Sequence, residues 1–212
     1  LEVRWFKTAG VRLVESPNVT IEQCEFWNDN WSRGRTIGEG ILSDKSPELT
    51  VDRCVLYAMN RPIQLNNSPR FRILHCTITM GLHHGVRFYS SAAGSVFRNN
   101  SLAFGGSYLL ALHPAEDLNA FDSDYNNLAA NIRADSRTQP APDEAIKPIP
   151  GDFFANKPAK YMVSCGGSDL YAGLREWQRK TGKDAHSIFK HPRYANPVKR
   201  DLLARAVNRL RP

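Results

Sequence analysis

The chain has 212 residues, of which 42% are hydrophobic and 23% charged, a composition typical of a soluble globular protein. No apolar run approaches the roughly 18–20 residues of a membrane span, so the sequence predicts none. The formal net charge is +7, but residues 1–134 hold 13 basic and 13 acidic residues, whereas residues 135–212 hold 15 and 8. This dispersed surplus in the last third predicts a solvated face rather than a nucleic-acid partner.

The chain begins inside a predicted strand, LEVRWF (1–6), so we expect it to be the C-terminal part of a longer protein. One phrase then recurs along the chain, each time ending in cysteine. A looser fourth copy spans 85–102 with Asn100 in the cysteine position, and a worn fifth copy spans 107–128. The three clear copies are SPNVTIEQC (16–24), SPELTVDRC (46–54) and SPRFRILHC (68–76).

Each copy alternates apolar and polar residues with a period of two, which predicts strands. In the first copy, Val11 and Leu13 flank Arg12, and Val19 and Ile21 flank Thr20. The Ser-Pro pair between these runs predicts a turn, and a third short strand follows the cysteine. Three short strands in about 22 residues suit one coil of a parallel β-helix, where each strand pairs with its equivalent in the next coil.

With these repeats, residues 1 to about 134 resemble the right-handed parallel β-helix repeat proteins of the pectate-lyase-like superfamily. FDSDYNNL (121–128) and LREWQRKTGKDAHSIFKHPRYANP (174–197) resemble the closing segment of many bacterial secreted β-helix proteins. The resemblance implies an all-β fold, a right-handed parallel β-helix of about five coils with three short strands each. It also implies a location that is secreted, periplasmic or at the cell surface.

The cysteines that end the first three copies, Cys24, Cys54 and Cys76, are interpreted as a buried column, because Asn100 takes their place in the fourth. A stacked disulfide is one alternative, since successive coils lie about 4.8 Å apart, but parallel side chains seldom reach its torsion. A metal or redox site is the other, although CxxC spacing is absent. Cys165 lies outside the column.

In the resembled family, polymer substrates lie across the outward residues of the first strand, beside the variable loops. Carried over to this chain, the face predicts an acidic polysaccharide as partner. The predicted catalytic residues are Arg87, His84 and Asp44. The predicted substrate-binding residues are Arg12, Gln64, Asn66, Tyr89, His83, Arg35 and Glu39. Trp27 and Trp31 are further candidates, either for stacking on a sugar or for packing the long loop onto the solenoid.

Two reactions fit such a face. A lyase acting on a uronic acid needs a cation to neutralise the carboxylate and a base to remove the C5 proton. Arg87, Arg12 or His84 are candidates for these parts, and Asp44 or Glu39 for holding Ca²⁺. A hydrolase needs two carboxylates roughly 5–10 Å apart, for which Asp44 with Glu39, or with Asp29 from the long loop, is the nearest pair. Neither set is complete; the lyase is preferred, and a non-catalytic glycan-binding or structural surface protein is the alternative.

Residues 135–212 are predicted to form an extended linker and a helical cap packed on the β-helix. Five prolines within 137–160 predict an extended segment. A helix is predicted over 168–182, starting at Asp169, stopping at Thr181-Gly182 and docking Leu174 and Trp177 on the β-helix. A second amphipathic helix is predicted over 201–210.

Overall fold

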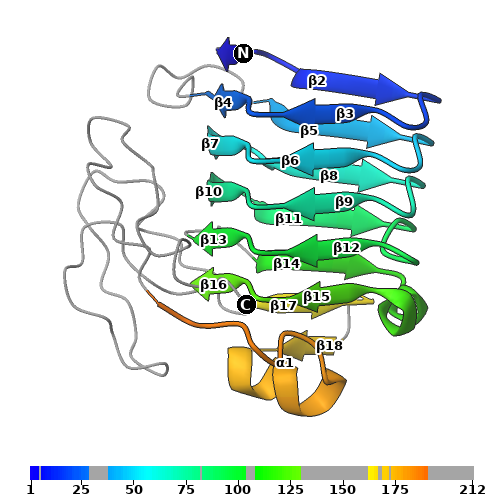
Figure 1. Cartoon of the computed structure of the whole chain (residues 1–212), viewed down its shortest axis with the longest axis vertical. Coiled ribbons are helices and arrows are strands. Elements are labelled where there is room, and N and C mark those ends of the chain that lie inside the picture. The colour runs from blue at the N-terminus through cyan, green and yellow to red at the C-terminus, as the bar shows by residue number, and fades with distance from the viewer. Residues whose placement is uncertain are drawn as a thin grey trace.

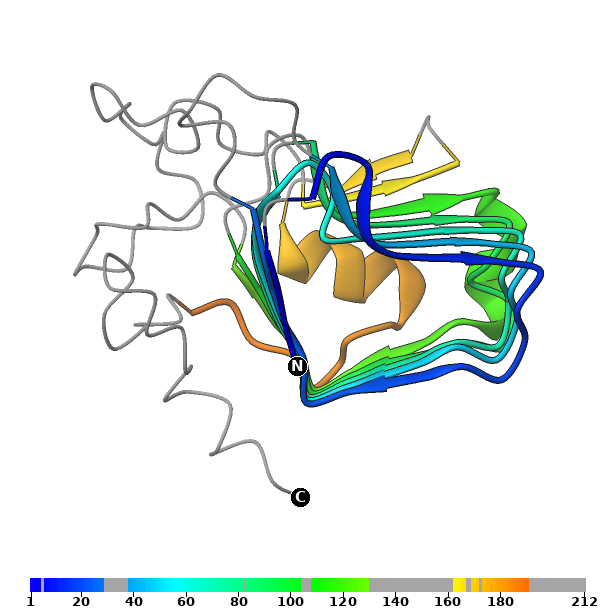
Figure 2. The same ribbon diagram turned by 90° about the horizontal axis from the view of Figure 1, so that it is seen from above.

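A computed structural model describes residues 1–28, 38–103, 108–129 and 162–190, except Trp5, Leu82, residues 167–168 and Ala172. The described chain is a parallel β-solenoid of five coils, each built from three strands that stack on their equivalents (Figure 1). The predicted fold is therefore confirmed. Seen along the stack, the three strands of each coil enclose a core (Figure 2).

Three parallel sheets run along the stack, and each takes one strand from every coil. Sheet I contains β2 (Ala9–Val14), β5 (Glu39–Asp44), β8 (Ile63–Asn66), β11 (His84–Tyr89) and β14 (Tyr108–His113). Sheet II contains β3 (Thr20–Glu22), β6 (Thr50–Asp52), β9 (Arg72–Leu74), β12 (Val96–Arg98) and β15 (Asp122–Asp124). Sheet III contains β1 (Glu2–Arg4), β4 (Glu25–Trp27), β7 (Val55–Met59), β10 (Thr77–Gly81), β13 (Ser101–Ala103) and β16 (Asn127–Ala129).

Residues of the same kind stack on one another in successive coils, because the two-residue period repeats at the same place in each coil. In sheet I, Ile41 pairs with Ile63, which pairs with Val86, and all three are fully buried. Phe88 lies at the centre of an aromatic cluster within the core. Its ring centroid is 4.3 Å from that of Phe71 and 6.0 Å from those of Phe97 and Phe121.

The turn from sheet I to sheet II is built by the serine of each Ser-Pro pair. The hydroxyl of Ser46 accepts a hydrogen bond from the amide of Ser16, and that of Ser68 accepts one from Ser46. Ser91 continues the series with the amide of Ser68. Each of these hydroxyls also donates to the carbonyl two residues upstream, so the serine fastens two coils and its own turn at once.

Replacing Ser68 by alanine is expected to lower the free energy of unfolding by about 1–2 kcal/mol, because the buried amide of Ser46 loses its acceptor. Urea denaturation measures the change. Ser16→Ala is the matched control, since its hydroxyl donates to Val14 within its own turn. Equal losses in the two variants would contradict the role assigned to the stacked serines.

The turn from sheet II to sheet III carries the predicted cysteine column. In every coil after the first, the side chain at this place donates to a carbonyl one coil back: Cys54 to Ile21, Cys76 to Val51, Asn100 to Ile73 and Asn126 to Phe97. Asparagine also accepts an amide from the preceding coil, as Asn100 does from Cys76. All four cysteines are free thiols, so the disulfide alternative is wrong, and the buried column is confirmed for Cys54 and Cys76, whereas Cys24 in the first coil is only half-buried.

The end of the solenoid is covered by the segment after residue 161. Strand β17 (Val163–Cys165) continues sheet I in parallel below β14, and β18 (Asp169–Tyr171) turns back antiparallel to it. Helix α1 (Leu174–Thr181) then crosses the open end below the last coil, inside the outline of the coils (Figures 1 and 2). Leu174 and Trp177 are buried, as predicted.

The predicted start of this helix is wrong. Asp169 lies in β18, and the helix begins at Leu174 after the N-cap Gly173, because pairing with β17 satisfies the backbone of 169–171. The predicted stop is confirmed by Gly182, which has a φ of 68°. No described helix is long and apolar enough to cross a membrane. The predicted domain boundary at 134/135, the linker at 137–160 and the helix at 201–210 lie outside the described residues.

Candidate functional site

The outer face of sheet I carries most of the predicted site residues, in three rows that run along the stack. The middle row aligns Arg12, Leu42, Gln64, Arg87 and Ala111, one from each coil. The end row aligns Val14, Asp44, Asn66, Tyr89 and His113. The third, which we call the edge row, lies where the chain enters sheet I and contains Glu39, Asn60, Arg61, His84 and Tyr108.

Glu39 and Arg61 form the first contact of the edge row. The Nη1 of Arg61 donates to Oε1 of Glu39 at 2.7 Å, and Nδ2 of Asn60 donates to the same oxygen at 2.8 Å. Side-chain exposure is only 19% for Arg61 and 16% for Glu39, so solvent screens this pair less than a surface ion pair. A guanidinium this close fixes the Glu39 carboxylate as its counterion.

His84 is the second element of the edge row. Its ring lies 5.4 Å from that of Tyr108, and the ring of His83 lies 6.0 Å away on the solvent side of the chain. Burial, together with the charges of Arg61 and Arg87, lowers the pKa of His84 from 6.5 to about 4. The imidazole is therefore neutral at pH 7, flanked by two permanent cations.

Tyr89 and His113 form a ring platform in the end row. Their rings stack with centroids 6.2 Å apart, and the guanidinium of Arg87 lies 5.8 Å from the Tyr89 ring. Tyr89 is 46% exposed, unusual for a side chain of its size. Nearby, Nε2 of Gln64 donates to Oδ1 of Asn66 at 3.3 Å. An exposed ring beside amide groups can take the apolar face of a sugar while the amides bind its hydroxyls.

The three predicted catalytic residues do not form one cluster. His84 and Arg87 interact on β11, but Asp44 lies two coils away and at the other end of its strand. With a coil spacing of about 4.8 Å and a rise of about 3.3 Å per residue, the Cα atoms of Asp44 and His84 are roughly 19 Å apart. Asp44 is therefore not a partner of His84 in a single chemical step.

The same geometry argues against the hydrolase pair. Glu39 and Asp44 are the first and last residues of β5, so their Cα atoms lie about 16 Å apart. The carboxylates of glycoside hydrolases are about 5–9.5 Å apart. The described residues also contain no group of three or more metal-ligating side chains, and Glu39 is already the counterion of Arg61. Asp44 and Glu39 are therefore too far apart to bind the same Ca²⁺ ion.

Of two other predicted positions, one is not described by the structure and the other does not contribute to this face. Arg35 lies outside the described residues. Trp27 is 2% exposed, and its Nε1 donates to Oε1 of Glu2 at 2.9 Å while Arg4 lies over its ring. Its stacking on a sugar is therefore excluded, because β1 covers the ring.

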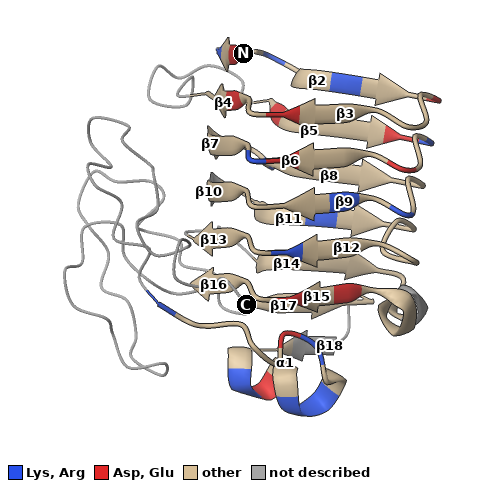
Figure 3. Cartoon of the chain, in the orientation of Figure 1, with Lys and Arg blue, Asp and Glu red and all other residues tan. Residues whose placement is uncertain are grey.

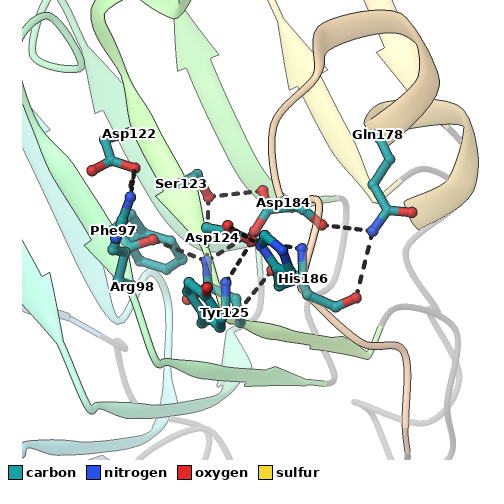
Figure 4. Close-up of polar contacts among 11 residues, drawn as sticks. Phe97, Arg98, Asp122, Ser123, Asp124, Tyr125, Gln178, Asp184 and His186 are labelled. Carbon is teal, nitrogen blue, oxygen red and sulfur yellow. Dashed lines mark hydrogen bonds and ion pairs between the residues drawn. The ribbon is translucent and has the colours of Figure 1, made fainter. Parts of the chain in front are cut away.

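The structure also shows a site that sequence reasoning did not single out, at the junction of the last coil and the cap (Figure 4). A cleft of about 330 Å³ there is lined by Asn119, Ala120, Phe121, Asp122, Ser123, Asp124, Gly182, Lys183 and Asp184. The aspartates are paired within the fold: Asp122 with Arg98, and Asp124 with the ring and backbone amide of His186. Although burial opposes it, the hydrogen bonds from His186 lower the pKa of Asp124.

The residues around this cleft are those of the predicted closing motif. Gln178 donates to the carbonyl of Asp184, and the amide of Asp184 donates to that of Ser123 on the last coil. The chain then pairs with sheet III, where Leu128 and Asn126 exchange backbone hydrogen bonds with Ile188. The S-D-Y-N and W-Q-x-x-T-G-x-D-x-x-S patterns therefore close the solenoid.

The buried thiols offer little chemistry. The hydrogen bond with Cys76 lowers the pKa of Cys54 to about 7, while burial raises that of Cys76. Cys54 is only 1% exposed, which keeps reagents from the sulfur. Basic and acidic positions are scattered over the described coils, in keeping with their balanced composition (Figure 3).

Comparison with known proteins agrees with the architecture. The chain belongs to the family described as right handed beta helix region, whose model matches residues 1–136. No curated protein and no solved structure matches the chain. The family defines the solenoid and its handedness, whereas the chemistry has to be inferred from the face of sheet I.

The low pKa of His84 predicts how stability depends on pH. Unfolded His84 takes up its proton near pH 6.5, whereas the folded residue does so only near pH 4. The contribution of His84 to the free energy of unfolding is therefore fully present above pH 6.5 and is lost as the pH falls toward 4. The loss is on the order of 1–2 kcal/mol after allowance for solvent screening. Burial and Arg87 lower the pKa of His113 in the same direction. Chemical denaturation of wild type and His84→Gln between pH 7 and 4.5 measures this loss. The free energy of unfolding of the variant should depend less steeply on pH than that of the wild type. Identical pH dependences in the two proteins would contradict the prediction.

Proposed function

We propose that the protein is an extracellular carbohydrate-active β-helix protein that binds an acidic polysaccharide across the outer face of sheet I and cleaves it by β-elimination. The observation that supports this most is the neutral imidazole of His84 in the edge row, which lies near Arg61 of the same row and Arg87 of the middle row. Guanidinium groups pair with carboxylates through charge-assisted hydrogen bonds, and a uronic-acid polymer carries a carboxylate on each ring.

The roles follow from the charge states. The guanidinium of Arg87 carries a positive charge, so it neutralises the uronate carboxylate and makes the C5 proton acidic, while Arg61 beside it is held by Glu39. Neutral His84 accepts that proton, because only an uncharged imidazole has a free lone pair. The C5–H electron pair forms the C4–C5 double bond as the C4–O bond breaks, and the proton returns to the leaving oxygen.

A non-catalytic glycan-binding protein at the cell surface is the second candidate. The ring platform of Tyr89 and His113 favours it, since stacking of this kind binds sugars without any chemistry. The hydrolase is disfavoured by the separation of Glu39 and Asp44 along β5. Both remaining candidates place the ligand on the same face and outside the cytoplasm.

Incubation of the protein with a panel of uronic-acid polymers tests the proposal. Cleavage by elimination gives an unsaturated product with ultraviolet absorbance, which we expect from the wild type and from His75→Gln, an exposed histidine away from this face. His84→Gln should lose it. Reducing ends without absorbance would indicate a hydrolase, and retained binding without any product would indicate the glycan-binding alternative.

A further inference from the structure

Sheet II is the sheet that the cap leaves without a further strand among the described residues. After the fifth coil, sheet I continues with β17, and sheet III continues at Ile188, whose amide donates to the carbonyl of Asn126. Strand β15 instead forms the end of sheet II. The cleft of about 330 Å³ at the junction of the last coil and the cap lies against this strand, since it is lined by Asp122, Ser123 and Asp124.

The hydrogen bonds of the earlier coils show which groups of β15 are left open. In each of the first four coils, the carbonyl just before the strand of sheet II accepts the amide that begins the strand of the next coil. The four pairs are Val19 with Thr50, Leu49 with Arg72, Phe71 with Val96 and Ser95 with Asp122. The equivalent carbonyl of the fifth coil belongs to Phe121, and no amide in the described part of the chain donates to it.

The amide of Ser123 is the second open group on this edge. Successive residues of a strand direct their backbone groups to opposite neighbours, and the amide of Asp122 donates to Ser95 of the coil above. Ser123 therefore faces the cap, where its carbonyl accepts the amide of Asp184 at 2.8 Å. Its own amide has no partner within the described ranges, although the residue is only 4% exposed. Buried amides without a partner are rare, so this one calls for a specific reason.

The two open groups match one residue of an added strand. In a parallel ladder, a residue donates its amide to the carbonyl before its partner and accepts the amide that follows its partner. The carbonyl of Phe121 and the amide of Ser123 flank Asp122 in this way, so they fit a residue placed beside Asp122. The main chain of an extended peptide supplies a donor and an acceptor at this spacing.

The side chains around the cleft favour a peptide with positive charge. Three aspartates and one lysine line the cleft, and Asp122 is open to solvent over 45% of its side chain. Two of these aspartates have arginine or histidine partners, whereas the four donors of Asp184 are all neutral. Helix α1 also ends at the cleft with Gly182, and the C-terminal end of a helix carries partial negative charge.

We propose that the free edge of β15 is a docking site for a partner protein, which contributes an extended basic segment as a short parallel strand. Strand addition is a common mode of peptide recognition, in which main-chain hydrogen bonds give affinity and side-chain contacts give specificity. It also covers an edge that is otherwise open to unwanted pairing. The site uses no residue of the outer face of sheet I, so it is independent of the polysaccharide proposed for that face.

NMR of the backbone amides tests this with a hexapeptide of alternating lysine and valine, blocked at both ends. Two control peptides carry glutamate in place of lysine, or N-methyl groups on every amide. The lysine peptide should shift the Ser123 amide resonance and slow its hydrogen exchange at least tenfold. Asp122→Asn should weaken binding of this peptide at least threefold. Glu22→Gln, on β3 at the other end of sheet II, loses the same charge and should bind as the wild type does.

The proposal is overturned if the lysine peptide leaves Ser123 unchanged up to its solubility limit, or if either control peptide has the same effect. Undiminished binding by Asp122→Asn also overturns it. In the free protein, a Ser123 amide that exchanges as slowly as the bonded amide of Asp122 would show that the chain itself fills the edge. A Ser123 resonance that moves with protein concentration would assign the edge to a second copy, and either result overturns the proposal.

Discussion

Replacing Asp184 by alanine is expected to lower the free energy of unfolding by about 3–5 kcal/mol and to release helix α1 from the last coil. The carboxylate is 1% exposed and joins the cap to the solenoid. Its Oδ2 accepts from Nε1 of Trp177 and from the hydroxyl of Ser123, both at 2.8 Å. Its Oδ1 accepts from Nδ2 of Asn126 at 2.9 Å and from the hydroxyl of Ser187 at 2.6 Å. Alanine removes an acceptor from four buried donors, of which Nδ2 of Asn126 keeps its hydrogen bond to the carbonyl of Phe97.

Urea denaturation measures the loss, and amide hydrogen exchange over 122–129 reports whether the last coil opens. Asp184→Asn keeps the size and one oxygen, so it should fall between wild type and alanine. Asp122→Ala is the matched control, because its side chain is 45% exposed and its pair with Arg98 contributes under about 1 kcal/mol. If Asp184→Ala cost no more than Asp122→Ala, the carboxylate would not be what holds the cap.

Replacing Phe88 by alanine is expected to cost about 3–5 kcal/mol, the usual range for removing a buried phenylalanine. The side chain is fully buried between Phe71, Phe97 and Phe121, which come from the neighbouring coils and sheets. The stacked strands cannot close around the cavity, because each backbone is bonded to the coils above and below it. Chemical denaturation gives the value.

Tyr89 is the matched control, since it is the next residue of β11 and points the other way. Tyr89→Ala should cost under about 1 kcal/mol of stability, because its ring is 46% exposed. It should instead weaken sugar binding if the ring platform is used. Equal losses of stability in Phe88→Ala and Tyr89→Ala would contradict the inward and outward assignment of the whole strand.

The solenoid could be predicted from the sequence because each structural position recurs once per coil. Ser46 and Ser68 bind the same way in successive turns, and Cys76 and Asn100 make equivalent bonds to the coil before. A single stretch of alternating residues would have been ambiguous, but repetition at one place fixed the register. The cap was predicted less well, because β18 forms by pairing with β17, which the spacing of apolar residues along the sequence does not indicate.

For the candidate site, alternation predicted which residues face outward but not which of them meet. Arg87 and Tyr89 are on the outer face as predicted, whereas the distance along β5 that separates Glu39 from Asp44 follows only from the strand's length. Arg61 was predicted only as a loop neighbour of this face, without a specific role, because it lies before β8, where no periodicity applies. Asp184 had one signal, its place in the closing motif, but two of its four donors, Ser123 and Asn126, come from the last coil, 61 and 58 residues away.

The central claim is that the outer face of sheet I binds an acidic polysaccharide. It is tested most directly by the retention of Arg87→Gln and Arg72→Gln on an immobilised uronic-acid polymer at one fixed salt concentration. The two variants lose the same charge, but Arg72 is exposed on sheet II. The account predicts that wild type and Arg72→Gln are retained and that Arg87→Gln binds at least tenfold more weakly. Equal retention of the two variants, or no retention of the wild type, would contradict it.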